Sequence, residues 1–282
     1  MAVLAGVFAC GGRVNRPPPL PSPASSGSKT ETLSHDAPPG GWSFHYAVGS
    51  SNYRITRIAA IEAPSDSGLR REVSTNTTYE SISVETGPGT DTMVVTVVAD
   101  SFATTTQGRI GSVQPVQLPV KISGVSTEGG FKVEGQAPAA RCDPVASTLV
   151  SDLRNLLPAL PAQLTPGISW SDSIQTSSCQ AGIPITVNLR RTFFVSGEAR
   201  GEGRPSLVIL RTDTITARGE GSQLQHRVAL QAEGTGRATY HFDPAIGKVV
   251  QLTTGQDLNL AFTASSRTTR FRETSQQEFL LR

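Results

Sequence analysis

Apolar and polar residues alternate with a period of two in segment after segment from Gly41 to the C-terminus. In residues 185–195, for example, Ile185 and Val187 would point to one side of a strand, and Thr186 and Asn188 to the other. Strands of this kind form antiparallel sheets that bury one face and expose the other. The alternation therefore predicts a mainly β protein, built on a curved antiparallel sheet that is half-barrel or barrel-like.

One stretch, near residues 143–157, has the pattern of an α-helix instead. Asp143 is suited to the N-cap, Pro144 to the first helical position, and Pro158 to the position that stops the helix. The apolar residues between them recur at helical spacing and form one stripe: Val145, Leu149, Val150, Leu153, Leu156 and Leu157. A stripe of this width has to be buried, so we predict that the helix packs on the sheet.

The predicted helix divides the β-rich domain, residues 42–282, into two strand-rich halves, residues 42–141 and 168–282. Each half contains a strand, a turn with glycine, and a second strand with a lysine near its start, at 120–133 and at 240–250. The halves are either a duplication or two independent hairpins, because hairpins of this composition arise easily without common ancestry.

The N-terminus has the pattern of an export signal. Residues 1–9 form an apolar run that is too short to cross a bilayer as a helix, which takes about 20 residues, and that matches the apolar region of a signal peptide. Residues 10–41 hold seven of the 19 prolines, and we expect this Pro/Ser-rich stretch to be a disordered tether. The alternative is a buried N-terminal strand with Cys10 in the core.

The segment Val7-Phe8-Ala9-Cys10 resembles the bacterial lipobox, in which a cysteine becomes the lipidated first residue of the mature chain. The resemblance implies that Cys10 carries lipid.

If Cys10 carries lipid, Cys142 and Cys179 remain as a pair that an oxidising compartment would join in a disulfide. The alternative is two buried free thiols. Two cysteines without histidines at ligand spacing do not make a zinc site.

Composition and motifs exclude several classes of function. The formal net charge is only +2 and the charged fraction 17%, which argues against nucleic acid as a partner, because nucleic-acid proteins need a clustered basic surface. The histidines lack metal-ligand spacing, and neither a nucleophile elbow nor a phosphate loop is present, so we predict no catalytic residue, no metal and no cofactor. A hydrolase with a noncontiguous Ser/His/Asp site would need His45, His226 or His241 beside a serine and an aspartate in a cleft.

The lipobox-like residues, the tether, the alternating strands and one turn segment together resemble uncharacterised β-rich lipoproteins of Gram-negative bacteria. That segment runs from Leu160-Pro161 to Pro166-Gly167-Ile168-Ser169-Trp170. The resemblance implies a lipid-anchored protein of the bacterial cell envelope, at the outer membrane, in the periplasm or at the cell surface. A curved sheet closed by one helix is also similar to periplasmic carriers that hold acyl chains in a half-barrel, which is an analogy of fold and not of function.

We therefore predict a non-enzymatic cell-envelope lipoprotein, expected to be a monomer, that binds a lipid-like apolar ligand or a partner protein. Its lipid anchor would attach it to the membrane. The residues expected to line the ligand pocket are Leu149, Leu153, Leu156, Leu157 and Trp170. The alternatives are the hydrolase described above and a purely structural, scaffold role.

Overall fold

The computed structural model of the chain describes residues 41–43, 46–65, 68–86, 93–106, 109–110, 121–127, 130–133, 142–180, 183–201, 204–223 and 226–282. The signal-like segment, Cys10 and the tether up to residue 40 lie outside these ranges, and so does His45. Within them the chain is mainly β with one α-helix, which confirms the fold class predicted from the alternation.

The elements follow one another along the chain as strands, with the helix in the middle. The strands are β1 (Trp42–Ser43), β2 (Gly49–Ser65), β3 (Gly68–Thr86), β4 (Met93–Thr106), β5 (Arg109–Ile110), β6 (Lys121–Thr127), β7 (Gly130–Val133), β8 (Gln163–Leu164), β9 (Ser169–Gln180), β10 (Ile183–Gly201), β11 (Arg204–Gln223), β12 (His226–Asp243), β13 (Lys248–Ala264) and β14 (Arg267–Leu281). The helix α1 spans Pro144–Leu156, between β7 and β8.

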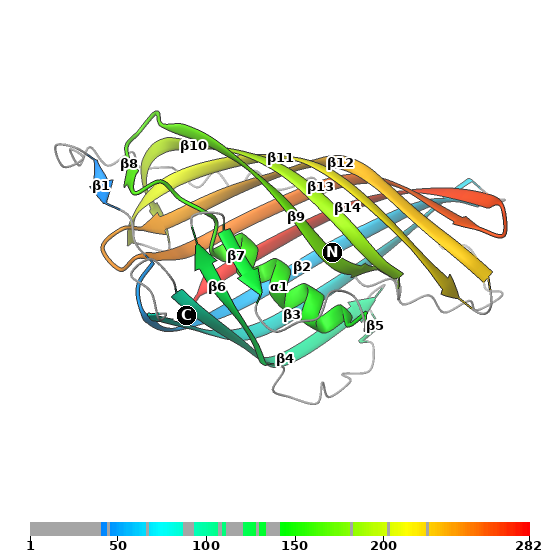
Figure 1. Cartoon of the computed structure of the whole chain (residues 1–282), viewed down its shortest axis with the longest axis horizontal. Coiled ribbons are helices and arrows are strands. Elements are labelled where there is room, and N and C mark those ends of the chain that lie inside the picture. Colours follow the sequence, from blue (N-terminus) through cyan, green and yellow to red (C-terminus); the bar gives the residue numbers. More distant parts are fainter. Residues whose placement is uncertain are drawn as a thin grey trace.

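All strands except β1 and β8, which pair with each other, belong to one 12-stranded antiparallel sheet that curls into a half-barrel (Figure 1). Its order is β7-β6-β4-β3-β2-β14-β13-β12-β11-β10-β9, and β5 pairs with β4. The first and last parts of the domain join where β14 pairs with β2, with Phe279 opposite Ile55. The two predicted halves are thus parts of one continuous sheet, and their duplication stays a hypothesis.

The side chains of the long strands alternate as predicted. On β10, Ile185, Val187 and Phe193 are buried on the inner side of the sheet, while Thr186 and Asn188 are exposed on the outer side. The same alternation on β11 to β13 gives an apolar cluster that contains no helix residue, in which the inner faces of these strands pack on one another. The sheet therefore curls tightly enough to bury part of its own inner face.

Two glycines allow this curl. A Cβ atom at Gly234, on β12, would lie 2.0 Å from the backbone oxygen of Asp257 on the neighbouring strand. A Cβ atom at Gly219, on β11, would lie 2.3 Å from the backbone oxygen of Pro184. Since only a residue without a Cβ fits such close approaches, glycine is required where neighbouring strands bend toward each other.

The helix has the predicted bounds and cap. Asp143 is the N-cap, and its Oδ1 accepts hydrogen bonds from the backbone N–H groups of Val145 (2.9 Å) and Ala146 (3.2 Å). The helix ends at Leu156, with Leu157 as C-cap, directly before Pro158. It contacts β9 on one side and β4, β6 and β7 on the other, so it lies across the opening between the two edges of the sheet (Figure 1).

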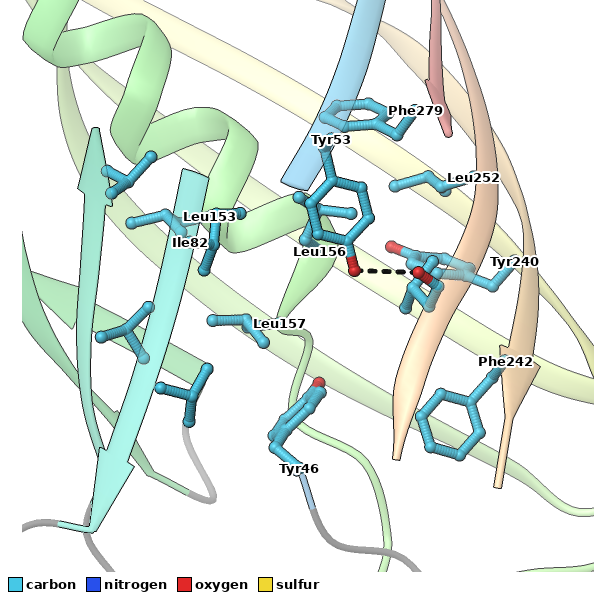
Figure 2. Packing of buried hydrophobic residues seen from close by; sticks show 14 of the residues in the cluster. Tyr46, Tyr53, Ile82, Leu153, Leu156, Leu157, Tyr240, Phe242, Leu252 and Phe279 are labelled. Carbon is cyan, nitrogen blue, oxygen red and sulfur yellow. Dashed lines mark hydrogen bonds between the residues drawn. The ribbon is translucent and has the colours of Figure 1, made fainter. Parts of the chain in front are cut away.

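The apolar stripe of α1 fills the space under the helix. Leu149, Leu153 and Leu156 are at most 2% exposed and belong to the main core cluster. Figure 2 shows the helix leucines facing the inner aromatic side chains of the sheet. Among these, the Tyr53 hydroxyl donates a hydrogen bond to the backbone oxygen of Val249 at 2.9 Å, so its one polar atom is satisfied in the core.

The predicted disulfide is present. Cys142 directly precedes the N-cap of α1, Cys179 lies near the end of the edge strand β9, and their Cα atoms are 5.2 Å apart. The bond therefore attaches the start of the helix to one edge of the sheet.

Replacing Cys142 and Cys179 together by serine should lower the free energy of unfolding by about 3 to 4 kcal/mol, because the bond closes a loop of 37 residues in the unfolded chain. Urea unfolding of the unlipidated full chain measures this loss, and Cys10→Ser is the matched control that should not change it. Coincident unfolding curves for the double variant and the control would refute a stabilising bond.

Candidate functional site

Two clusters of charged residues lie on either side of α1, inside the curled sheet. The first joins Arg57 of β2, Glu80 of β3 and Asp152 of the helix, all at most 6% exposed. Arg57 donates through Nη1 to the Thr78 hydroxyl at 2.8 Å, and its Nη2 forms ion pairs with Asp152 and, at 3.5 Å, with Glu80 Oε1. One buried arginine thus serves two buried carboxyl groups.

The charge imbalance of this cluster falls on Glu80. Burial raises the pKa of Glu80 well above its usual value, and the nearby Asp152 carboxylate raises it further, while Arg57 acts in the opposite direction. Burial and a like charge both favour the neutral acid, so Glu80 keeps its proton in the folded protein at pH values where an exposed glutamate is ionised. The cluster is then close to neutral.

The second cluster contains three arginines on three different elements. Arg191 of β10 makes a two-pronged contact with Asp172 of β9, with 2.7 Å between Nε and Oδ1. Arg211 of β11 is bound to Asp213, with 3.0 Å between Nη2 and Oδ2. Arg154, in the last turn of α1, donates to the Thr176 hydroxyl. Arg191 Nη1 also donates to the backbone oxygen of Arg154 at 3.5 Å, and Arg211 Nη1 donates to Asn155 Oδ1 at 3.1 Å. Polar contacts therefore hold this flank of the helix against β9, β10 and β11.

A cavity of about 60 Å³ lies between this flank of α1 and the sheet. The three arginines line it, together with Asn155 and the helix serines, and with Gln256 and Gln277 from β13 and β14. A second hollow of about 20 Å³ lies beside Tyr53 and Leu157. The larger hollow has room for a few water molecules and the smaller one for a single water molecule. Neither hollow has room for an acyl chain.

The residues predicted to line a lipid pocket have a different role in the structure. Leu149, Leu153, Leu156 and Leu157 are core residues, and only the last two border the smaller hollow. The Trp170 ring stacks on Phe193 with 5.0 Å between ring centroids, and its Nε1 donates to the backbone oxygen of Ala159 at 3.1 Å. The stripe of the helix occupies the space that we expected a ligand to fill.

The two described histidines each contact a serine. His241 Nδ1 lies 3.2 Å from Ser206 Oγ, and His226 Nδ1 lies 3.0 Å from Ser265 Oγ. The Ser206 hydroxyl also lies 3.1 Å from the backbone oxygen of Ala199, to which it donates, and partial burial lowers the pKa of His241. Within the described ranges neither histidine contacts a carboxylate or lines either hollow, so the residues required for the hydrolase hypothesis are not brought together there.

The described residues offer neither a metal site nor a membrane-spanning helix. They contain no group of three His, Cys, Asp or Glu side chains placed to hold a metal ion. In the same part of the chain, no helix has the length and apolar character to span a bilayer.

Sequence reasoning missed the buried charges, although a signal for them exists. Arg191 stands between Leu189 and Phe193, and Arg211 between Ile209 and Asp213, all at positions that the alternation assigns to the inner face. A charged residue is rarely buried unless it is paired. An arginine that interrupts the apolar series of a strand therefore indicates a polar site inside the sheet.

No protein-family model matches the sequence, and no curated protein matches it. Among solved structures, the chain is similar to Salmonella typhi OmpF in complex with daunomycin (8% identity, TM-score 0.29, 82% of this chain and 97% of that chain covered). It is also similar to Pseudomonas aeruginosa OccK2 (OpdF) in complex with glucuronate (8% identity, TM-score 0.26, 84% and 99% covered). Similarities at these TM-scores carry no argument about the function of this chain.

Replacing Glu80 by glutamine tests the first charged cluster. The folded-state pKa of Glu80 is raised above its unfolded value, so its contribution to stability is present at low pH and is lost as the pH rises from about 4.5 toward the folded-state pKa. Glu80→Gln removes this loss, so we expect the free energy of unfolding of the variant, relative to that of the wild type, to increase as the pH rises from 4 to 8.

Urea unfolding at a series of pH values measures the difference between the two proteins. The control is Glu220→Gln, which removes an exposed carboxylate paired with Arg227 and should leave the pH dependence of stability unchanged. Parallel pH profiles for the wild type and Glu80→Gln would contradict a raised pKa.

Proposed function

We propose that the chain is a non-enzymatic lipoprotein of the bacterial cell envelope that acts by binding a partner protein or a polar ligand. The observation that carries this proposal is the Cys142–Cys179 bond, because disulfides of this kind persist in oxidising compartments such as the periplasm. The bond attaches the helix to the sheet, which supports folding in such a compartment.

The tether and the lipid anchor complete the proposal. Cys10 follows an apolar run and precedes the Pro/Ser-rich stretch, so a lipid on Cys10 would hold the folded domain at a distance from the membrane. A single short acyl chain binds membranes weakly, whereas a lipoprotein anchor with more than one chain holds firmly.

The packing of the interior favours a partner protein or a polar ligand over a lipid. Pockets for ligands of drug size measure about 300 to 1,000 Å³. The two hollows described above measure about 60 and 20 Å³, and arginines, serines and amides line the larger one together with four aliphatic residues. An apolar ligand would have to displace the leucines of α1 from the core.

A catalytic role is not supported by the contacts of the histidines. In a Ser/His/Asp site the serine gives its proton to the histidine and a carboxylate orients the ring. Here the Ser206 hydroxyl donates to a backbone oxygen. Ser265 lies in the two-residue turn between β13 and β14, where Ser265 and Ser266 both have positive φ, as in a type I′ hairpin turn.

Metabolic labelling with radioactive palmitate in a Gram-negative host tests the lipid anchor. The wild type should carry label and appear in the membrane fraction, and Cys10→Ala should carry none. The double variant Cys142→Ser with Cys179→Ser is the control that should keep its label. Label on Cys10→Ala, or no label on the wild type, would overturn the lipoprotein proposal.

A further inference from the structure

Arg154 is the one arginine of the larger cavity that has no carboxylate partner among the described residues. Arg191 is bound to Asp172, and Arg211 is bound to Asp213. The described contact of the Arg154 guanidinium is the donation from Nη1 to the Thr176 hydroxyl. Its Nε is buried without a hydrogen-bond partner. The cavity wall therefore carries one positive charge in excess.

The rest of the wall combines hydrogen-bonding side chains with an apolar floor. Ser147, Ser151 and Asn155 come from α1, and Gln256 and Gln277 come from the sheet. The apolar residues are Val187, Leu189, Ile215 and Leu258. Asp213 is the only carboxylate on the cavity wall as described, and Arg211 neutralises it. An excess cation with hydrogen-bond donors around it suits an anion better than a neutral or cationic group.

The electrostatics of Arg154 point the same way. Burial and, to a smaller extent, the charge of Arg191 together lower the pKa of the Arg154 guanidinium to about 10. At neutral pH Arg154 is still charged, so it is a partly desolvated cation beside a second cation. An anion in the cavity would relieve both the desolvation and the repulsion.

The size of the cavity limits what the anion can be. A volume of about 60 Å³ corresponds to a few water molecules, which is enough for one carboxylate or phosphate group and too little for a larger ligand. Part of the wall reaches the surface, because Ser147 and Ser151 of α1 and Thr176 of β9 are only partly buried. A group carried by a larger molecule could therefore enter between α1 and β9.

We propose that this cavity is a binding site for an oxyanion group, a carboxylate or a phosphate, held by Arg154 together with the serine and amide donors around it. The proposal deepens the binding role proposed above and rests on it for its biological meaning. It does not depend on the lipid anchor, so the labelling experiment and the experiment below can fail independently.

Thermal unfolding of the unlipidated chain, followed by circular dichroism, tests the site with inorganic phosphate as the probe. Ionic strength is kept constant with sodium chloride at pH 7. The melting temperature of the wild type should rise with phosphate along a saturating curve. Arg154→Gln should weaken the apparent affinity by at least about tenfold, the effect of losing charge-assisted hydrogen bonds.

Two further variants make the result specific. Arg218→Gln, which removes an exposed arginine on the outer face of β11, should keep the wild-type curve. Arg154→Lys keeps the charge without the fork of donors, and it should bind more weakly than the wild type and more strongly than Arg154→Gln. Without phosphate, Arg154→Gln should be at least as stable as the wild type, because it removes an unpaired charge.

A titration with acetate in the same series distinguishes the two sources of the oxyanion. Saturation by acetate at lower concentrations than phosphate would assign the site to a carboxylate, and the reverse order to a phosphate. Superimposed phosphate curves for the wild type and Arg154→Gln would overturn the proposal. So would a loss of stability in Arg154→Gln that no anion changes, because Arg154 would then have a structural role alone.

Discussion

The burial of one helical stripe is the interaction on which the rest of this structure depends. An antiparallel sheet that curls without closing leaves two edges, here β7 and β9, and an inner face that must be covered. Leu149, Leu153 and Leu156 cover it, because α1 lies across the opening and inserts them among the inner side chains of the sheet. Without the helix, the largest core cluster would be open to water.

The helix in turn depends on the sheet. A 13-residue helix is marginal in water on its own, so most of its stability comes from packing. The Asp143 cap and the Cys142–Cys179 bond fix its first turn, and the charged contacts of Asp152 and Arg154 hold its two flanks. The buried Arg57–Asp152 ion pair adds little net stability, but breaking it leaves an uncompensated charge, so it fixes the rotation of the helix more than it strengthens the fold.

Much of this arrangement could be predicted from the sequence, because it depends on local patterns. The alternation in residues 185–195 assigns Ile185 and Val187 to the inner face, and Asp143, Pro144 and Pro158 mark the ends of the helix. The disulfide followed from an even pair of cysteines. The pairing of β14 with β2 could not be predicted, because it joins segments far apart in the chain and leaves no local pattern.

The interior could be predicted only in part. Periodicity shows which side chains point inward, but not whether the space between them is filled, and for this reason Leu153 and Trp170 were expected around a ligand and lie in packed contacts instead. Alternation places Arg191 and Arg211 on the inner face but does not show which residues pair with them. The partners, Asp172 and Asp213, become visible only through the register of the strands.

The helix α1 is a permanent part of the core and not a lid over a ligand cavity. Native-state hydrogen exchange of the α1 amides distinguishes these two roles. The amides of Leu153 and Leu156 should exchange only through global unfolding, with the same opening free energy as the central amides of β11 and β12. Exchange of the helix through an opening that costs several kcal/mol less, while the strands stay protected, would contradict it.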